Sequence, residues 1–74
     1  MAVILRRSNP NSKPNWVRML KAYHTVDEVY QPDARLKAGK GWEITTLDAI
    51  HICEVLDKNG IEYEKKSEHI IEIL

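Results

Sequence analysis

Few residues in this 74-residue sequence could do chemistry, and none of them forms a catalytic pair by spacing. His51 and Cys53 come closest to a base and a nucleophile. Two residues apart on a helix, they point about 200° away from each other and cannot share a proton. His24, His51 and His69 lack metal-ligand spacing, and a single cysteine excludes the usual zinc patterns. We therefore expect no metal and no cofactor, and we favour a protein that is not an enzyme.

A second feature with possible chemistry is the short run Gly39-Lys40-Gly41. Its backbone N–H groups could be presented to a phosphate. A P-loop, however, has the pattern GxxxxGK[ST], and this run has neither that spacing nor the hydroxyl residue after the lysine. A helix end followed by a turn is the interpretation that we favour.

The amino-terminal third of the chain combines positive charge with aromatic side chains. Residues 1–25 contain five cations and no acid, interleaved with Trp16 and Tyr23. Such a pattern offers charge for phosphates and ring faces on which an unpaired base could stack. The candidate residues for binding nucleic acid or an acidic partner are Arg6, Arg7, Lys13, Trp16, Arg18 and Lys21. The alternative is an ordinary solvated face with both aromatic rings in the core.

The carboxyl-terminal half has the opposite charge. Residues 41–74 hold eight acids against three lysines, although the whole chain is neutral. The candidate acidic face, which could occupy a basic groove on a nucleic-acid-handling enzyme, consists of Glu54, Glu62, Glu64, Glu68 and Glu72. Segregated charge bears on partners and solubility rather than on fold. The alternatives are a face that only provides solubility, or two chain ends that are neighbours and neutralise each other.

The elements that must position these residues are organised around one helix, predicted over residues 46–58. Thr45 can cap its first turn, and Asn59-Gly60 can end it in a left-handed conformation. At 100° per residue, its apolar side chains form a stripe that suits a helix lying on a sheet. These side chains are Ala49, Ile50, Ile52, Cys53 and Leu56.

The first half of the chain predicts a strand, a loop and a second strand before a short helix. Ala2–Arg7 is rich in β-branched residues and predicts a strand. Residues 8–15 are all polar or turn-forming, which predicts an exposed loop, and Pro10 and Pro14 argue against a helix through it. The stretch 16–24 fits a helix or a strand, and we interpret it as a strand.

The reason for that interpretation is the capping box that follows. Thr25-Val26-Asp27-Glu28 predicts the start of a helix at Thr25, and one helix can hardly run into the cap of the next. Pro32 should keep this helix short. Asp33–Ala38 could add one further helical turn ended by Gly39, before a short extended piece at Trp42–Ile44.

The chain closes with two predicted strands. Residues 61–65 alternate, residues 66–68 suit a turn, and residues 69–74 form an apolar strand. An apolar strand in this position must be central in a sheet or covered by a partner, since an exposed apolar edge aggregates. The sequence therefore predicts a single α+β domain over 1–74, with an antiparallel or mixed sheet of about four strands and the 46–58 helix across one face.

Part of this carboxyl-terminal segment resembles a toxin family. Leu56-Asp57-Lys58-Asn59-Gly60, a strand, and then Lys66-Ser67-Glu68-His69 are similar to the helix–strand–turn–strand segment of HicA-type mRNA interferase toxins. In that family a histidine after a Gly-Ser-type turn cleaves RNA, so the resemblance implies a ribonuclease with His69 as its catalytic residue. The match covers about a third of the chain, no glycine precedes Ser67, and Glu68 separates the serine from the histidine.

Composition limits the remaining classes of protein. No apolar run approaches the roughly 20 residues of a membrane span, and Ala2–Leu5 lacks the form of a signal peptide. We therefore expect no membrane partner. One cysteine cannot form an internal disulfide, which suits a reducing cytoplasm.

These observations lead to three expected functions. The first is a small non-enzymatic protein that docks on and modulates a macromolecular partner, resembling in size the inhibitors and adaptors of phages and mobile elements. The partner is expected to be a protein. The second is binding of RNA or DNA by the basic segment, and the third is the ribonuclease. We also expect a possible homodimer through the terminal strand, with Ile71 and Ile73, or Ile70 and Leu74, at the contact.

Overall fold

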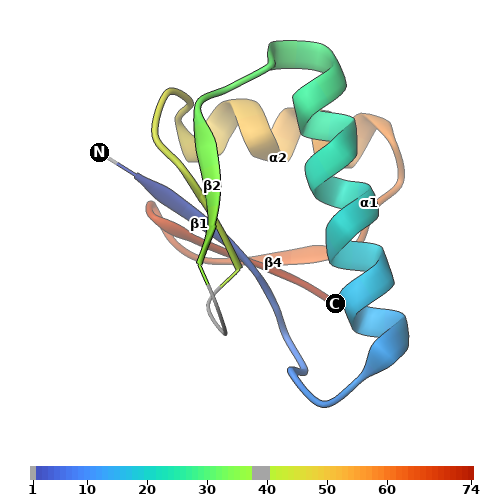
Figure 1. Ribbon diagram of the computed structural model, residues 1–74. Coiled ribbons are helices and arrows are strands. Elements are labelled where there is room, and N and C mark those ends of the chain that lie inside the picture. Colours follow the sequence, from blue (N-terminus) through green and yellow to red (C-terminus); the bar gives the residue numbers. More distant parts are fainter. Residues whose placement is uncertain (1, 38–40) are drawn as a thin grey trace.

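The described residues of the computed structural model, 2–37 and 41–74, form a five-stranded sheet and two helices (Figure 1). The predicted α+β class is confirmed, but the sheet has five strands instead of about four. In chain order the elements are β1 (Val3–Arg7), α1 (Lys13–Tyr30), β2 (Ala34–Lys37), β3 (Gly41–Ile44), α2 (Ala49–Lys58), β4 (Tyr63–Ser67) and β5 (Ile70–Ile73).

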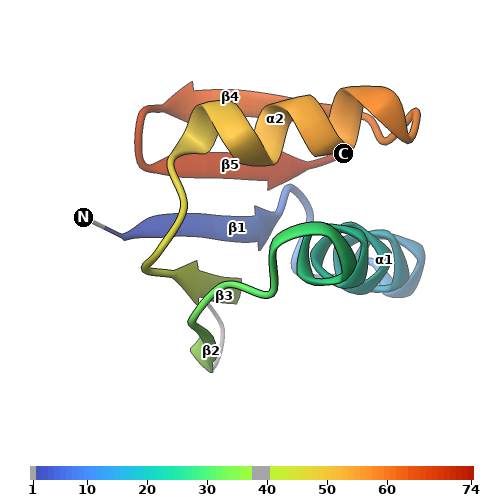
Figure 2. The same cartoon turned by 90° about the horizontal axis from the view of Figure 1, so that it is seen from above.

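The strand order is β2-β3-β1-β5-β4, so the first strand is the centre of the sheet (Figure 2). β1 pairs antiparallel with β3 and parallel with β5, and two antiparallel hairpins supply the edges. The apolar strand β5 lies between β1 and β4. Its backbone is therefore paired on both sides, which meets the requirement that such a strand be internal.

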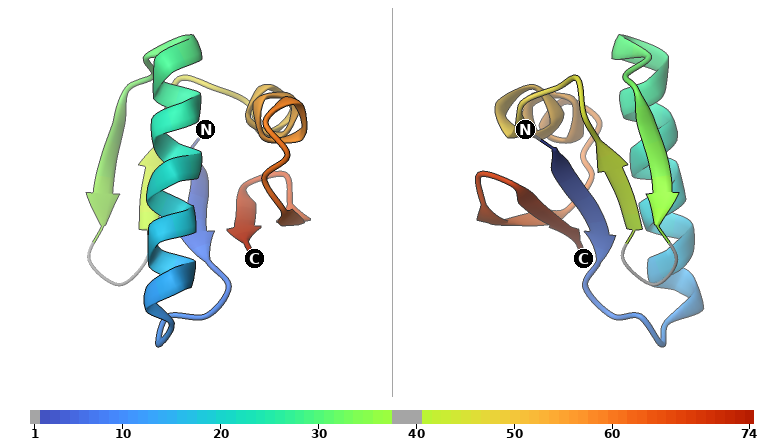
Figure 3. Two further views of the ribbon diagram at one scale, coloured as in Figure 1. Left: turned by 90° about the vertical axis from the view of Figure 1, so that its right-hand side faces the viewer. Right: turned by 60° about the vertical axis from the view of Figure 1, so that its left-hand side comes forward.

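One face of the sheet and both helices enclose a single core (Figure 3). Alternate side chains of the strands point toward the helices, as the period of two in a strand requires. The fully buried members of this core with the largest volumes are Leu5, Met19, Ile44, Ile52, Leu56, Ile71, Ile73 and Val26. The opposite face carries no helix among the described residues, and we call it the open face.

The predicted strand at 16–24 and helix start at Thr25 are wrong, because α1 runs unbroken over Lys13–Tyr30. The Ser12 side chain caps this helix by accepting a hydrogen bond from the backbone N–H of Asn15 at 3.2 Å. Pro14 falls in the first turn, where its missing N–H costs little. Thr25 lies inside the helix and its hydroxyl donates to the Lys21 carbonyl at 2.8 Å, which satisfies the group that would otherwise cap.

Because α1 begins earlier than predicted, the loop before it is shorter than predicted. The predicted exposed loop at 8–15 ends at Ser12, and Asn15 is only 2% exposed. After α1, Gln31 takes the left-handed conformation that ends the helix, with its N–H donating to the Asp27 carbonyl. The segment that follows is β2, so the predicted helical turn over 33–38 is also wrong. Gly39, predicted to end that turn, and the Gly39-Lys40 part of the glycine-flanked run lie outside the described residues.

Helix α2 confirms the predicted element but begins at Ala49 rather than residue 46. Asp48 is its N-cap residue, because the two threonines before it have other partners. The Thr45 hydroxyl donates to the carbonyl of Asp33, and Thr46 accepts from the Asp33 N–H. Ile50, expected in the buried stripe, is 63% exposed. The helix ends at the predicted Asn59-Gly60.

The final hairpin is shifted by about two residues from its predicted place. β4 spans Tyr63–Ser67 with an irregularity between Lys65 and Ser67, so the turn consists of Glu68 and His69. β5 follows at Ile70–Ile73 as expected. Among the described residues, no helix has both the length and the apolarity needed to cross a bilayer.

Candidate binding surfaces beside the first half of α1

The basic candidate residues come from two elements that meet at one end of the molecule. Arg6 and Arg7 end β1, and the other candidates lie on the first half of α1, after the short loop that follows β1 (Figure 1). Most of these residues line one of two clefts. Arg6, Arg7 and Trp16 line one, and Arg18 and Lys21 line the other. Because Trp16 and Arg18 point to opposite sides of a helix, the clefts flank α1 on either side.

The first cleft has a volume of about 380 Å³ and lies between the end of β1, the start of α1 and the hairpin of β2 and β3. The Arg7 guanidinium lies 5.0 Å above the centre of the Trp16 ring and donates to the Pro10 carbonyl. A cation over an indole face is attracted by its quadrupole, which fixes Arg7 in place. Lys37 also lines this cleft. Sequence reasoning missed it because its strand was predicted to be helical.

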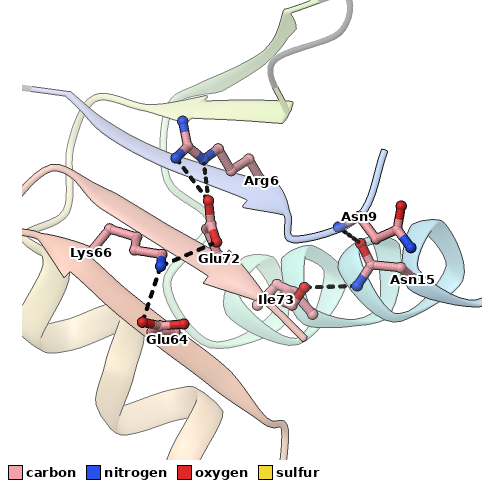
Figure 4. A network of polar contacts seen from close by, with 7 residues as sticks. All are labelled: Arg6, Asn9, Asn15, Glu64, Lys66, Glu72 and Ile73. Atoms are coloured by element: carbon pink, nitrogen blue, oxygen red, sulfur yellow. Dashed lines mark hydrogen bonds and ion pairs between the residues drawn. The ribbon is translucent and has the colours of Figure 1, made fainter. Parts of the chain in front are cut away.

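A network of ion pairs on the open face joins one cation from the start of the chain, Arg6, to acids from its end (Figure 4). In the register of β1 and β5, Arg6 is opposite Glu72, and their side chains pair at 2.8 Å. Lys66 links Glu72 to Glu64 at 3.9 and 3.0 Å. The expected separation of the two charge signs is therefore wrong at Arg6 and Glu72. A parallel pairing of the first and last strands is what brings them together.

A second group of charges lies on the other half of the open face. Glu43 of β3 pairs with Lys37 at 2.8 Å and with Arg35 at 3.5 Å. The hydrogen bond from Lys37 is the main cause that lowers the pKa of Glu43, with a further contribution from the charge of Arg35. Pairs this close to solvent contribute little to folding, because water screens their charges. Their main consequence is that most charge on this face is neutralised internally.

The five acidic candidates do not share one face. Glu64 and Glu72 lie on the open face, whereas Glu54 is on α2 in the helix layer. Glu68 is in the β4–β5 turn, and Glu62 lines the second cleft. A single acidic docking face made of these residues is therefore not present.

The second cleft also has a volume of about 380 Å³ and lies between α1, the link from α2 to β4, and the end of β5. The Arg18 guanidinium donates to the Leu74 carbonyl at 3.3 Å. In the part of the chain that the structure describes, no Asp or Glu side chain forms an ion pair with Lys13, Arg18 or Lys21. Val17, between them on the same face of α1, is 62% exposed. We call Lys13, Val17, Arg18 and Lys21 the basic stripe.

The charges of α1 run against the dipole of the helix. Its first turn has no acid and contains Lys13, whereas its last turn has no base and contains Asp27 and Glu28. A helix is stabilised by the reverse order, by about 0.3–1 kcal/mol for each charge in a terminal turn. Helix stability therefore does not account for this placement.

Asn15 joins the segments that carry both clefts, although the sequence predicts that it lies in an exposed loop. Its amide nitrogen donates to the Ile73 carbonyl at 2.7 Å, and its amide oxygen accepts from the Asn9 N–H at 2.9 Å (Figure 4). A buried amide whose nitrogen and oxygen both form hydrogen bonds stabilises the local structure. It joins the loop, the start of α1 and the end of β5. An isolated buried polar residue of this kind leaves no signal in the sequence.

His51 and Cys53 lie on α2, whereas His24 lies on α1 and His69 in the β4–β5 turn. Cys53 packs against the core, and His51 meets the Tyr30 ring edge-on with 5.8 Å between ring centres. His69 is in the β4–β5 turn, where its N–H donates to the Ser67 hydroxyl. No group of three or more His, Cys, Asp or Glu side chains within 2–37 and 41–74 is placed to hold a metal ion.

Comparison of the chain with protein-family models, with curated proteins and with solved structures finds no match. The two clefts and the basic stripe are therefore the features from which a function can be inferred.

Proposed function

We propose that this protein is a small non-enzymatic binding protein that docks on and modulates a protein partner through the basic stripe. One observation carries the proposal. Three exposed cations without an Asp or Glu partner in the described structure surround an exposed valine, and one of them, Lys13, lies in the first turn, where positive charge disfavours the helix. The partner surface is expected to be acidic with an apolar centre, because apolar contacts supply affinity and complementary charge supplies orientation.

A protein partner fits this surface better than nucleic acid does. Binding to a phosphate backbone depends on the number of cations that replace counterions. The whole chain is neutral, and two of the cations at this end are already paired, Arg6 with Glu72 and Lys37 with Glu43. Val17 contributes nothing to phosphate binding, whereas an exposed apolar side chain among cations suits an amphipathic protein surface.

Nucleic-acid binding is the second candidate function, and the position of Arg7 over Trp16 favours it. A guanidinium stacked on an indole provides a flat, cationic surface for an unpaired base. A salt titration separates the two functions, because each phosphate neutralised on duplex DNA adds about −0.9 to the log–log slope of affinity against salt. If neither RNA nor DNA binds at low salt, the second function is excluded.

The test of the first function uses the triple variant K13E/R18E/K21E as bait beside the wild type. Extract of the source cells is treated with nuclease before capture, so that partners held through nucleic acid are lost. The matched control is Lys65→Glu, which reverses an exposed lysine on β4, away from α1. We expect a protein that the wild type and Lys65→Glu retain after nuclease treatment and that the triple variant loses.

Two results would count against this function. Capture that disappears with nuclease for every bait would favour nucleic acid as the partner. Equal capture by the wild type and the triple variant would remove the basic stripe from any docking role.

We further propose a cytoplasmic location, since the single Cys53 cannot form an internal disulfide. A homodimer through the carboxyl-terminal end is also proposed. Ile71 and Ile73 are fully buried in the core, which leaves half-buried Ile70 and exposed Leu74 as the residues that could reach a second copy. Sedimentation of a monomer at high protein concentration would exclude the dimer.

A further inference from the structure

We propose that the first cleft binds the phosphate group of an organic ligand, held by Arg6, Arg7 and Lys37. These residues are distinct from the basic stripe and lie on the other side of α1. The proposal therefore does not depend on protein docking, and either one can fail while the other holds.

The charge of the cleft favours an anion. Three cations from two strands line it, and Glu72 is the only carboxylate among its lining residues within the described chain. Arginine presents planar pairs of N–H donors that match phosphate oxygens, and lysine adds a compact charge. Arg6 pairs with Glu72 and Lys37 pairs with Glu43, so three cations and two carboxylates leave one net positive charge, on Arg7, that a phosphate can neutralise.

Each of the three cations retains donors that its partners in the chain do not occupy. Arg6 uses its Nε and one terminal nitrogen on Glu72. Arg7 uses one terminal nitrogen on the Pro10 carbonyl, and its ring contact with Trp16 holds the guanidinium without using further N–H groups. Lys37 pairs with one oxygen of Glu43. A guanidinium has five N–H donors and an ammonium has three, so donors remain on all of them.

The size and the apolar wall of the cleft indicate more than inorganic phosphate. Its volume of about 380 Å³ lies in the lower part of the roughly 300–1,000 Å³ range of small-molecule sites. Trp16 and the half-exposed Leu36 line it beside the cations. An organic group attached to the phosphate can lie against these side chains. The phosphate can come from a free nucleotide or from the backbone of a single-stranded nucleic acid.

The experiment titrates three probes into isotopically labelled wild-type protein and follows the Trp16 indole N–H and the Arg7 side chain by NMR. The probes are inorganic phosphate, adenosine monophosphate and a short single-stranded oligonucleotide. Saturable shifts at both residues with the monophosphate support a nucleotide site. Shifts with the oligonucleotide alone support a backbone phosphate. Absence of saturable shifts with both organic probes overturns the proposal.

Matched variants distinguish a specific phosphate site from non-specific electrostatic attraction. We expect Arg7→Gln and Lys37→Gln each to weaken binding by about ten-fold or more, because each removes a charge-assisted contact. Arg35→Gln should leave it within about two-fold: Arg35 pairs with Glu43 as Lys37 does, but it does not line the cleft. Glu72→Gln should tighten binding, since it removes the competing carboxylate. Equal losses in Arg35→Gln and Lys37→Gln would overturn the proposal, with thermal unfolding confirming that each variant folds.

Discussion

At the scale of single residues, the buried amide of Asn15 holds together the segments that carry both clefts. The loop after β1, the start of α1 and the end of β5 meet at its two hydrogen bonds. The positions of the cations on these segments therefore depend on a side chain that is almost entirely buried.

We predict that Asn15→Ala lowers the free energy of unfolding by about 1–3 kcal/mol, because it leaves the Ile73 carbonyl and the Asn9 N–H without their partner. Urea unfolding measures the change. The control is Asn11→Ala, an exposed asparagine in the same loop, expected to change stability by no more than about 0.5 kcal/mol. Equal effects of the two substitutions would contradict the structural role of Asn15.

The carboxyl of Glu43 provides a second test at this scale. Its pKa is lowered from the ordinary 4.5, chiefly by the hydrogen bond from Lys37. A carboxyl with a lowered pKa in the folded state adds stability above its unfolded pKa, and that stability is lost as the pH falls through the folded value. We predict that Lys37→Gln raises the pKa of Glu43 toward 4.5, as measured by NMR titration of the carboxyl carbon. Lys66→Gln, which removes a cation that pairs with other acids, should leave it unchanged.

At the scale of elements, the unfavourable charges at the ends of α1 lead to a prediction about stability. Lys13→Glu should raise the free energy of unfolding by about 0.3–1 kcal/mol, because an acid in the first turn stabilises the helix dipole. Lys21→Glu is the comparison, since it lies two turns further on, where the dipole has little effect. Thermal unfolding of both variants tests this. A loss of stability in Lys13→Glu would show that Lys13 has a structural role in α1.

Gly41 and Gly60 both have a positive φ, and we predict that replacing them lowers the free energy of unfolding by different amounts. Gly41 (φ +93°) faces the Leu5 carbonyl and the Arg6 backbone at the junction of β3 and β1, whereas Gly60 (φ +67°) faces open space. Gly60→Ala should cost about 1–2 kcal/mol, the penalty of a left-handed non-glycine residue. Gly41→Ala should cost more, because a Cβ there also displaces the central strand. Denaturant unfolding that ranks the two the other way would contradict the close approach of β3 to β1.

The sequence predicts elements correctly where one signal dominates. The apolar run of β1, the stripe of α2 and its Asn59-Gly60 end all point to the structure that is present. α1 was mispredicted because Thr25-Val26-Asp27-Glu28 has the form of a capping box, while the apolar face through Met19, Ala22 and Val26 continues past it. Burial of that face outweighs a local capping preference. Because β2 was not predicted, Lys37 was not recognised as a candidate residue. Only part of the lining of the first cleft could therefore be predicted.

At the scale of the whole molecule, the sheet brings the two ends of the chain together. Parallel pairing of β1 with β5 sets Arg6 opposite Glu72 and neutralises part of the charge difference seen along the sequence. No local pattern predicts such a pairing, because it depends on the order of strands in the sheet. Among the described residues, three of the cations without an Asp or Glu partner, Lys13, Arg18 and Lys21, lie on the first half of α1, and the proposed docking function depends on them.

The most direct test of that account compares affinity and stability in the triple variant K13E/R18E/K21E. The purified protein captured by the wild type is titrated against both forms by calorimetry, and thermal unfolding is measured on the same samples. We predict that the variant loses at least about ten-fold in affinity, about 1.4 kcal/mol, while its unfolding temperature stays the same or rises. Unchanged affinity, or a loss of affinity only in proportion to a loss of folding, would contradict the claim that the basic stripe is a docking surface.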